Sequence, residues 1–538
     1  MSIGMSSGLR PEPRQRPRAF GNHISSEASM DSVIGVDIGT QSTKAVLVAA
    51  DGTILAQASR AYAPDTPRPN WAEQHADVWL GAVEACLAEV AGAASGDVKA
   101  VCISALYGGS GIPVDAEMKP LHPCLIWMDR RAEAQVARVK AEIDLDRLGR
   151  VTGNGVDSYY GFTKMLWLRD ERPDVWDRTA LFLPPNAYVI HRLTGEVAVD
   201  HSSAGNIGGV YDVERRAWSR ETLDLLGIPA RMMPERLVAP TEAVGGLTAE
   251  VAARLGLPAG TPVIAGGVDA AVATYAAGVT EPGHHVAMIG TSMCWGYVAP
   301  TTDAAHGLIT MPYVVGQDLY VFGGAATAGA SVSWYREQFC QAEVAEGRAS
   351  GRDPHALLED AAAKVAPGAD GLVFLPYLMG ERSPVWDGRA SGAFVGLNLF
   401  HTRAHLYRAV LEGVTLALRH NMEAGAKGSA ALEPRLVVVG GAARSDLWMQ
   451  IIADVTGYPV WTIREDVEAA LGAARMAALG VGLIAREDRD SWITLVERAA
   501  PDPARGKRYD ALFAVYAGLY PALRDSMHAL AELRGPVG

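Results

Sequence analysis

The sequence predicts an α/β protein built from two similar halves, and three observations support this prediction. Apolar strands alternate with amphipathic helices along the chain, which is typical of this fold class. The strand-and-turn pattern Ile38-Gly39-Thr40-Gln41-Ser42 returns, about half a chain length later, as Ile289-Gly290-Thr291-Ser292. The 538 residues also suffice for two to four domains, at roughly 100–200 residues per domain. We therefore expect two related halves that present these turns to a shared cleft.

The first turn lies between two apolar strands in the segment 33–48. Around the central Gly39, its polar side chains belong to Asp37, Thr40, Ser42, Thr43 and Lys44. A glycine lets backbone N–H groups approach an anion closely, and hydroxyl groups can donate to its oxygens. A carboxylate at the end of the first strand can hold a hydrated metal beside that anion. The segment therefore predicts a phosphate-binding hairpin, with an ordinary hairpin as the alternative.

The next elements follow from local patterns. Asp51-Gly52 between apolar runs predicts a hairpin that joins residues 44–48 to residues 53–59. Apolar residues at near-helical spacing predict a helix over 76–91, followed by a strand over 100–103. The expected apolar stripe of that helix consists of Val78, Leu80, Val83, Leu87 and Val90. Just before the helix, Glu73 and Gln74 are suited to bond sugar hydroxyls, although an ordinary loop is the simpler explanation.

Asp269 is the best candidate for a catalytic group. It follows an apolar strand and two glycines in the segment 263–271, and its neighbours are small. Small neighbours leave room for a substrate, and a partly desolvated carboxylate could accept a proton from an attacking hydroxyl group. An N-cap for the next helix is the alternative explanation.

A third glycine turn, Gly440-Gly441-Ala442-Ala443-Arg444-Ser445, follows a strand expected over 435–439. Ser445 is expected to cap a helix over 446–456. A strand, a glycine turn and a helix in this order favour a nucleotide site. The standard phosphate-loop and dinucleotide motifs are absent, so scattered turns would have to hold the nucleotide. The breaker sequence near 278–282 predicts a boundary between domains at 31–279 and 280–538.

Three other segments are better explained by structure than by function. The run 162–168, with Lys164 and Trp167, is expected to be a helix face. Glu381 and Arg382, beside a turn, are expected to form a structural ion pair. A helix over 403–420, capped by Thr402, is expected to carry a core stripe.

Composition excludes several classes of function. The 48 basic and 61 acidic residues give a net charge of −13, which argues against nucleic-acid and anionic-membrane partners. Five scattered cysteines predict buried free thiols in a reducing compartment, and hence a cytoplasmic protein. No apolar run approaches the about 18 residues of a membrane span. Residues 1–30 lack the apolar core of a secretory signal and are expected to be a disordered leader.

In combination, these motifs resemble those of the FGGY carbohydrate kinases, a family with the actin-like ATPase fold. Besides the glycine turns, two signatures carry the resemblance, which runs from about residue 33 to about residue 482. They are Phe162-Thr163-Lys164-Met165-Leu166-Trp167-Leu168, and the stretch from Gly392-Ala393-Phe394-Val395-Gly396-Leu397 to His405-Leu406-Tyr407-Arg408-Ala409-Val410-Leu411-Glu412. The resemblance implies two actin-like domains that close on ATP, Mg²⁺ and a sugar.

The resemblance also implies roles for individual residues. Asp269 resembles the catalytic base, and Asp37 resembles the acid that contacts Mg²⁺ through water. Glu73 and Gln74 fall where the family often contacts the sugar. The nucleotide would be held by Gly39, Thr40, Ser42, Thr43 and Lys44 in the first turn, Gly290, Thr291 and Ser292 in the second, and Gly440, Gly441, Ala442 and Ser445 at the adenosine.

The segment 376–387 is most similar to xylulokinases and gluconate kinases, which implies a ketopentose such as xylulose as substrate. Xylulokinases typically carry Gly-Gln-Met-His-Gly where this chain has Ala105-Leu106-Tyr107-Gly108-Gly109. Tyr107 and Gly108 are therefore candidate substrate contacts, and a gluconate-like sugar acid, a polyol or another ketose remains an alternative. The alternatives from other classes are an actin-like ATPase that acts as a chaperone or scaffold and a silent sugar sensor. A homodimer is one possible assembly.

Overall fold

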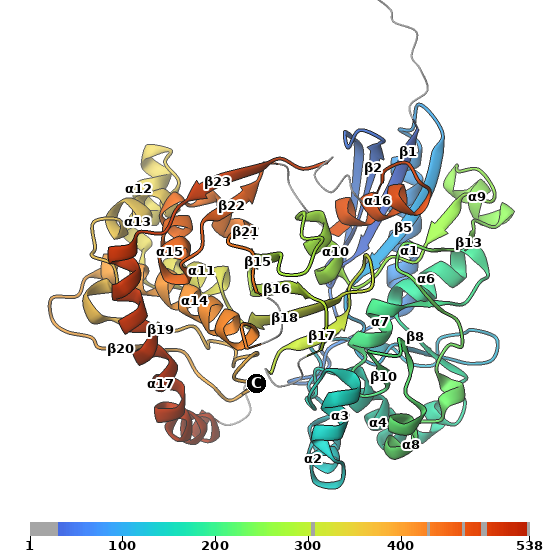
Figure 1. The fold of residues 1–538 in the computed structure, drawn as a ribbon, viewed down its shortest axis with the longest axis horizontal. Coiled ribbons are helices and arrows are strands. Elements are labelled where there is room, and N and C mark those ends of the chain that lie inside the picture. The colour runs from blue at the N-terminus through green and yellow to red at the C-terminus, as the bar shows by residue number, and fades with distance from the viewer. Residues whose placement is uncertain (1–30, 303–306, 428–430, 465–468, 486–491, 535–538) are drawn as a thin grey trace, which may run out of the picture.

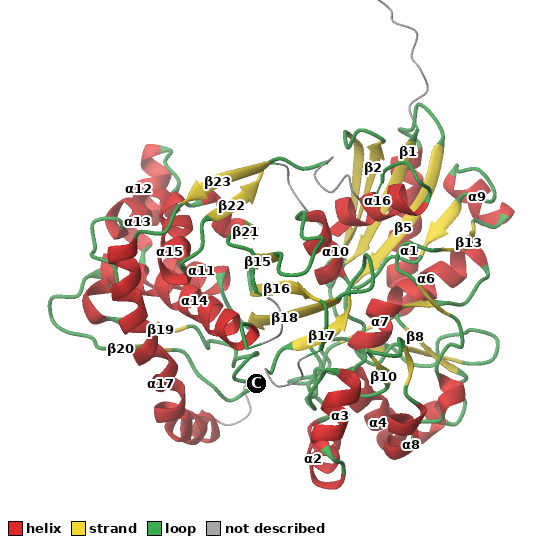
Figure 2. Cartoon of the chain, viewed as in Figure 1, coloured by secondary structure: helices red, strands yellow, loops and turns green. Residues whose placement is uncertain are grey.

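The computed structural model describes residues 31–302, 307–427, 431–464, 469–485 and 492–534, so the predicted leader lies outside the described residues. The chain forms two lobes, and each contains its own sheet (Figure 1). Helices lie against both sheets (Figure 2). Within the described ranges, no helix is both long and apolar enough to cross a membrane.

The first sheet has six strands in the order β13-β14-β5-β1-β2-β3. Strand β1 pairs antiparallel with β2 and parallel with β5. Side chains of β1 at 34, 36 and 38 pack with helix α1 (Ala76–Ala91) in one core cluster. The strands span Ala243–Gly246 (β13), Pro262–Ile264 (β14), Val98–Ala105 (β5), Ser32–Ile38 (β1), Ser42–Ala49 (β2) and Ile54–Ala61 (β3).

The second sheet has seven strands in the order β17-β18-β16-β15-β21-β22-β23. One of its faces packs against α14 (Arg403–Gly425) and α15 (Asp446–Thr456), and the long terminal helix α17 (Pro503–Arg534) packs on these two helices. The strands span Ile309–Pro312 (β17), Leu319–Ala325 (β18), Met293–Ala299 (β16), His285–Ile289 (β15), Leu436–Val439 (β21), Val460–Ile463 (β22) and Leu495–Ala499 (β23).

The two sheets repeat one topology. In each, three antiparallel strands (β1, β2, β3 and β15, β16, β18) are followed by two parallel neighbours (β5, β14 and β21, β22). The two predicted glycine turns occupy equivalent places, between β1 and β2 and between β15 and β16. The prediction of an α/β fold with two similar halves is therefore confirmed.

An insertion between β5 and β13 surrounds the predicted substrate side of the first lobe. Its helices are α2 (Glu133–Glu142), α3 (Leu145–Thr152), α4 (Gly161–Glu171), α5 (Pro173–Trp176), α6 (Pro185–Thr194), α7 (His201–Asn206) and α8 (Arg220–Leu226). Short strand pairs brace it, among them β6 (Ile112–Val114) with β8 (Leu181–Leu183). The second lobe adds α11 (Gly329–Phe339), α12 (Gln341–Ser350), α13 (Pro354–Ala362) and the pair β19 (Val373–Leu375) with β20 (Ala393–Val395).

Helix α16 (Ala469–Gly480) follows β22 in the chain but packs on the first sheet (Figure 1). It crosses β1 so closely that a Cβ at Gly35 would overlap the backbone of Ala470 and Ala474. Its other side meets α10 (Asp269–Ala276), where a Cβ at Gly472 would overlap the carbonyl oxygen of Val272. Small residues thus let one thin helix lie between β1 and α10, and this helix joins the lobes.

Local patterns predicted most of the helices and strands near the turns. The hairpin at Asp51-Gly52 and the helices over 76–91 and 446–456 are confirmed. The stripe expected on the first of these helices is partly wrong: Val78 is 41% exposed, whereas Trp79 is fully buried. The buried face is centred on this large indole, which offers more apolar area than a valine.

The close approach of α16 to α10 predicts that Gly472→Ala destabilises the protein. The added methyl group must push the helices apart, at a cost of about 1–3 kcal/mol, and the midpoint of thermal unfolding should fall. Gly81→Ala in α1 is a matched control, because a Cβ there meets no atom within 4 Å. Equal melting temperatures for Gly472→Ala and the wild type would contradict this packing constraint.

Candidate functional site

A cavity of about 300 Å³ lies where the two lobes meet. Its polar lining comes from both lobes: Asp37, Thr40 and Asp269 from the first, and Ser292 and Arg382 from the second. The rings of Tyr107, Trp127, Tyr159 and Phe322 contribute apolar walls. Residues distant in sequence thus converge on one partly enclosed space, which is the usual character of a small-molecule site.

Asp37 reaches this cavity because it is the next-to-last residue of β1. Side chains alternate along a strand, so Asp37 shares the face of Val33 and Gly35, which α16 covers. On the neighbouring strand β5, Ser104 donates a hydrogen bond of 3.0 Å from Oγ to Asp37 Oδ1. The carboxylate is therefore held at the end of the sheet, where the strands leave the core.

Asp269 is the first residue of α10, and Oδ1 accepts a hydrogen bond of 2.6 Å from the Ala270 N–H. The turn before it is fixed: Gly266 has a φ of 69°, and a Cβ there would overlap the carbonyl of Ile103. Ser202 Oγ accepts from the Val268 N–H at 3.1 Å and donates to Asp200. The alternative that Asp269 is an N-cap is wrong, because Val268 occupies that position without a side-chain capping bond, and Asp269 lines the cavity.

The carboxylates of Asp37 and Asp269 interact electrostatically. Burial raises the pKa of Asp269 above its ordinary value, and the negative charge of Asp37 raises it further. Each lost proton makes the next harder to remove, so the pair titrates as a unit. A raised pKa is what a group that accepts a proton near neutral pH requires.

In the first turn, the structure brings Gly39 and Thr40 to the carboxylates but not Thr43 or Lys44. The position of a Cβ on Gly39 is 4.0 Å from Asp37 Oδ2, and Gly39 N–H donates to the Ser42 carbonyl at 2.9 Å. Thr43 is fully buried and its hydroxyl bonds with Tyr62. Lys44 lines a separate hollow beside β3, with Arg60 and Glu89.

Thr40 is held in place by two side chains: Trp127, from the insertion, and Gln74, from the segment before α1. Trp127 Nε1 donates to Thr40 Oγ1 at 3.0 Å. Gln74 Nε2 donates to the Thr40 carbonyl at 3.1 Å, and Gln74 is only 1% exposed. The turn therefore has a fixed conformation before any ligand arrives.

Glu73 and Gln74 are not among the residues that line the cavity, and the sugar contacts expected of them stay a prediction. Glu73 is paired with Arg131, at 2.7 Å, and the Arg131 guanidinium lies over the Trp71 ring. Gln74 supports the Thr40 carbonyl instead. In this structure both side chains are bonded to other parts of the protein, and Gln74 contacts the first turn.

Tyr107 lines the cavity, and Gly108 lies beneath it. The Tyr107 ring packs on the Tyr159 ring with centroids 4.8 Å apart, and its hydroxyl accepts from the Gly161 N–H. Gly108 is buried, and a Cβ there would overlap the Pro185 ring. Tyr107 therefore lines the cavity while its hydroxyl is engaged with the Gly161 backbone.

A larger hollow of about 780 Å³ lies in the second lobe, beside the carboxyl ends of β15 and β21. These strands are parallel neighbours, so the turns that follow them meet at one edge of the sheet. The hollow is lined by Gly290, Thr291, Gly441, Ala442 and Ser445, with Trp334 and Tyr407 among its rings. Gly440, with a φ of 91°, lies against the Ile289 carbonyl, where a Cβ would be 2.7 Å away.

The second turn connects the two spaces. Thr291 lines the larger hollow and the next residue, Ser292, lines the smaller cavity. The turn is fixed by the start of α11, since Gly329 N–H donates to the Gly290 carbonyl at 2.8 Å and Ala330 N–H to the Thr291 carbonyl at 3.0 Å. An elongated ligand in the larger hollow could thus extend past this turn to Asp269.

Arg382 is a site residue that sequence reasoning missed. Its expected ion pair with Glu381 is absent: Glu381 accepts instead from the Ala326 and Arg382 backbone N–H groups, at 2.8 and 2.7 Å. The Arg382 side chain turns away into the cavity and lies 5.7 Å from the Trp127 ring. The different surroundings of Glu381 and Arg382, which are adjacent in the chain, become apparent only in the three-dimensional structure.

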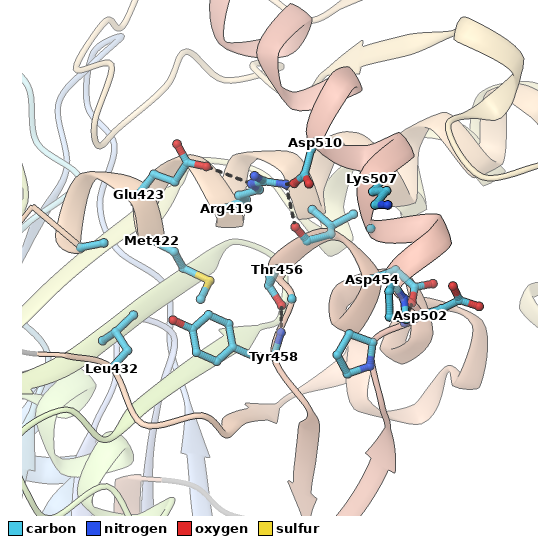
Figure 3. A pocket seen from close by; sticks show the side chains of 16 residues that line it. Arg419, Met422, Glu423, Leu432, Asp454, Thr456, Tyr458, Asp502, Lys507 and Asp510 are labelled. Carbon is cyan, nitrogen blue, oxygen red and sulfur yellow. Dashed lines mark hydrogen bonds and ion pairs between the residues drawn. The ribbon is translucent and has the colours of Figure 1, made fainter.

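A further hollow, of about 450 Å³, lies between α14, α15 and the start of α17 (Figure 3). Its charged groups are largely engaged with one another. Arg419 donates to Glu423, Asp510 and the Val455 carbonyl, and Asp454 accepts from Gln450. It shares no lining residue with the cavity at Asp269, and we do not include it in the site.

Comparisons with known proteins identify the family of the matching segments. Residues 32–276 match the N-terminal domain model of the FGGY family of carbohydrate kinases, and residues 285–481 match its C-terminal domain model. A xylulose kinase of Lactococcus lactis is 30% identical over 511 residues, which cover 94% of this chain and 99% of that protein. A gluconokinase of Bacillus licheniformis is 30% identical over 506 residues, 93% of this chain and 98% of that protein.

A crystal structure of xylulose kinase from Rhodospirillum rubrum is 33% identical, with a TM-score of 0.85. The match covers 92% of this chain and 100% of that one. Similarity of this kind extends across both lobes and the cavity between them.

The raised pKa of Asp269 predicts a pH-dependent cost to stability. The folded protein holds this proton more tightly than the unfolded chain, whose aspartate pKa is about 3.9. The free energy of unfolding therefore decreases as pH rises from about 4 to the raised pKa of Asp269, and it does not decrease further above that pKa. Asp269→Asn removes the ionisable group, so its melting temperature relative to the wild type should increase between about pH 5 and about pH 8.

The exposed Asp525 offers a control, because its side chain is 89% accessible. Asp525→Asn should follow the wild type at both pH values. If Asp269→Asn also did so, Asp269 would not carry a raised pKa.

Proposed function

We propose, from the premise that this chain belongs to the FGGY family of carbohydrate kinases, that it transfers the γ-phosphate of ATP to a hydroxyl group of xylulose or a closely similar small sugar. One observation supports this assignment most directly. Thr291 and Ser292 are consecutive, yet they line a nucleotide-sized hollow and a sugar-sized cavity that also contains Asp269. ATP in the hollow would direct its terminal phosphate toward the cavity.

Asp269 acts as the general base. It accepts the proton of the attacking hydroxyl group as that oxygen forms a bond to the γ-phosphorus. The bond between the γ-phosphorus and the bridging oxygen breaks, and ADP leaves with the electron pair. The raised pKa of Asp269 matches this task, because a base with an ordinary aspartate pKa would accept a proton only weakly.

Mg²⁺ fits the donors that this site offers. Asp37 supplies a hard carboxylate oxygen at the cavity, and the described residues contain no group of three or more His, Cys, Asp or Glu side chains that would form a complete metal site. Mg²⁺ usually keeps several waters and binds one or two carboxylates together with substrate phosphates. Asp37 would hold the ion through water, and the ion would neutralise charge on the phosphates.

The turns fix the phosphates and the walls exclude water. The N–H groups of Gly39 and Gly290 close the two turns, and the backbone N–H groups near Thr40 and Thr291 would approach the phosphates. Gly440, Gly441, Ala442 and Ser445 would surround the adenosine. Positioning and electrostatic stabilisation should supply most of the rate acceleration, as in other phosphoryl transfers. Closure of the lobes would limit transfer to water.

Xylulose is the first candidate substrate because xylulose kinases are prominent among the similar proteins. Gluconate is the second, because a gluconokinase is as similar in identity and length. The aromatic wall at Tyr107 differs from the Gly-Gln-Met-His-Gly expected of xylulokinases, so the sugar ring or chain would pack on an apolar face here. A homodimer stays a prediction.

The function is tested by measuring ADP release from ATP with xylulose, gluconate, other ketoses and polyols. We expect release to depend on one of these compounds. ADP release without dependence on any sugar would instead favour an actin-like ATPase that acts as a chaperone or scaffold.

Asp269→Asn should lower sugar-dependent turnover by about 10²- to 10⁴-fold, the usual contribution of a general base. Binding of ADP, measured by titration calorimetry, should stay near the wild-type value, because Asp269 does not line the larger hollow. Near-normal turnover in this variant would remove Asp269 from the role of base.

A further inference from the structure

We propose that Arg382 is a catalytic residue that the second lobe supplies to the phosphoryl group in transfer. This inference rests on the proposed function and adds a group that the glycine turns and the two carboxylates do not provide. Among the described residues that line the cavity at Asp269, Arg382 is the one cationic side chain. An incoming γ-phosphate would meet two carboxylates there, so a fixed positive charge is needed to offset their repulsion.

The position of the guanidinium is set by the second phosphate turn. Arg382 Nη2 donates to the Met293 carbonyl at 3.4 Å and to the Ala325 carbonyl at 3.2 Å. Met293 directly follows Ser292, the last residue of the turn. Gly324 makes room for this approach, because a Cβ there would lie 2.6 Å from Arg382 Nη2.

The first phosphate turn lies on the other side of the same group. The guanidinium is 5.7 Å from the Trp127 ring centre, and Trp127 Nε1 donates to Thr40 Oγ1. Arg382 is therefore bonded directly to the second turn and linked to the first turn through Trp127. Because both links lead to turns that are assigned to the phosphates, a phosphoryl group is the partner that we assign to Arg382.

The guanidinium also keeps donors for a ligand. All of its hydrogen bonds to the described residues use Nη2, and Nε is buried without a partner there. Nη1 makes no hydrogen bond to the described residues either and is not among the buried unpartnered atoms, so it is the donor that an oxygen ligand would meet. An arginine can offer two parallel donors to phosphate oxygens, which a lysine cannot do.

The backbone that carries Arg382 is firmly held. Glu381 N–H donates to the Asp387 carbonyl at 2.9 Å, and the reverse bond is 3.0 Å. Asp387 in turn accepts from Tyr520 of α17 at 2.7 Å. The charge is thus presented on a rigid loop, as electrostatic preorganisation requires.

The first experiment needs no sugar. Titration calorimetry measures binding of ADP, and of ADP with beryllium fluoride as a mimic of the γ-phosphate, both with Mg²⁺. Beryllium fluoride should tighten binding to the wild type. Arg382→Gln should lose about tenfold or more of this gain, while binding of ADP alone changes less than about threefold. The gain in binding of Arg382→Lys should lie between those of the wild type and Arg382→Gln.

The second experiment is kinetic and uses xylulose, or whichever sugar supports turnover. Arg382→Gln should lower kcat by about 10²- to 10³-fold, with the KM for the sugar nearly unchanged. Arg389→Gln is the matched control, because Arg389 lies on the same loop, is 57% exposed and pairs with Glu532 only at 3.8 Å. It should behave as the wild type in both experiments.

Three results would overturn the proposal. An unchanged kcat together with an unchanged gain from beryllium fluoride would exclude contact with the transferred group. A raised sugar KM with normal kcat would assign Arg382 to the sugar. If Arg382→Gln and Arg382→Lys both weakened the binding of ADP alone and lowered the melting temperature to the same extent, Arg382 would have a structural role. If no sugar stimulated the wild type while the beryllium fluoride result held, the proposed function would fail and the role of Arg382 would stand.

Discussion

The close packing of α16 between β1 and α10 is the contact on which the rest of the structure depends. Asp37 lies on β1 and Asp269 begins α10, so the distance between the two carboxylates is set by the helix between these elements. Gly35 and Gly472 leave space for that helix at its two sides. Since α16 comes from the second half of the chain, it also ties the lobes together. Stability and site geometry therefore rest on the same few small residues.

The two lobes contribute opposite electrostatic parts to the cavity. The first lobe provides two carboxylates, where burial and the charge of Asp37 raise the pKa of Asp269, and together they disfavour a second anion. The second lobe provides Arg382 and a turn whose carbonyls are occupied by α11, which leaves that turn in one conformation. Neither set would bind a phosphate and activate a hydroxyl group alone. The chemistry requires the lobes to meet, and the fold joins them through α16.

Local sequence patterns predicted much of the fold and the nearest part of the site. Asp37, Gly39 and Thr40 were recognisable because a strand, a glycine and hydroxyls stand together, and Asp269 because small residues surround it. The sequence could not show that Thr43 and Lys44 lie outside the site, since the direction in which each side chain points depends on where strand β2 begins. The position of Arg382 depends on contacts with Met293 and Ala325, far away in sequence, and no local pattern reports such contacts.

Helix α16 also bears on how the chain folds as it is synthesised. Residues 31–276 contain every strand of the first sheet, yet the face of β1 at Val33 and Gly35 is covered by residues 469–480. A nascent chain that ends before α16 emerges from the ribosome must therefore leave this apolar face open. The first lobe cannot complete its core as an independent unit, although domains generally fold in order of synthesis. Such intermediates would expose a surface suited to chaperone binding until the last strands and α16 are made.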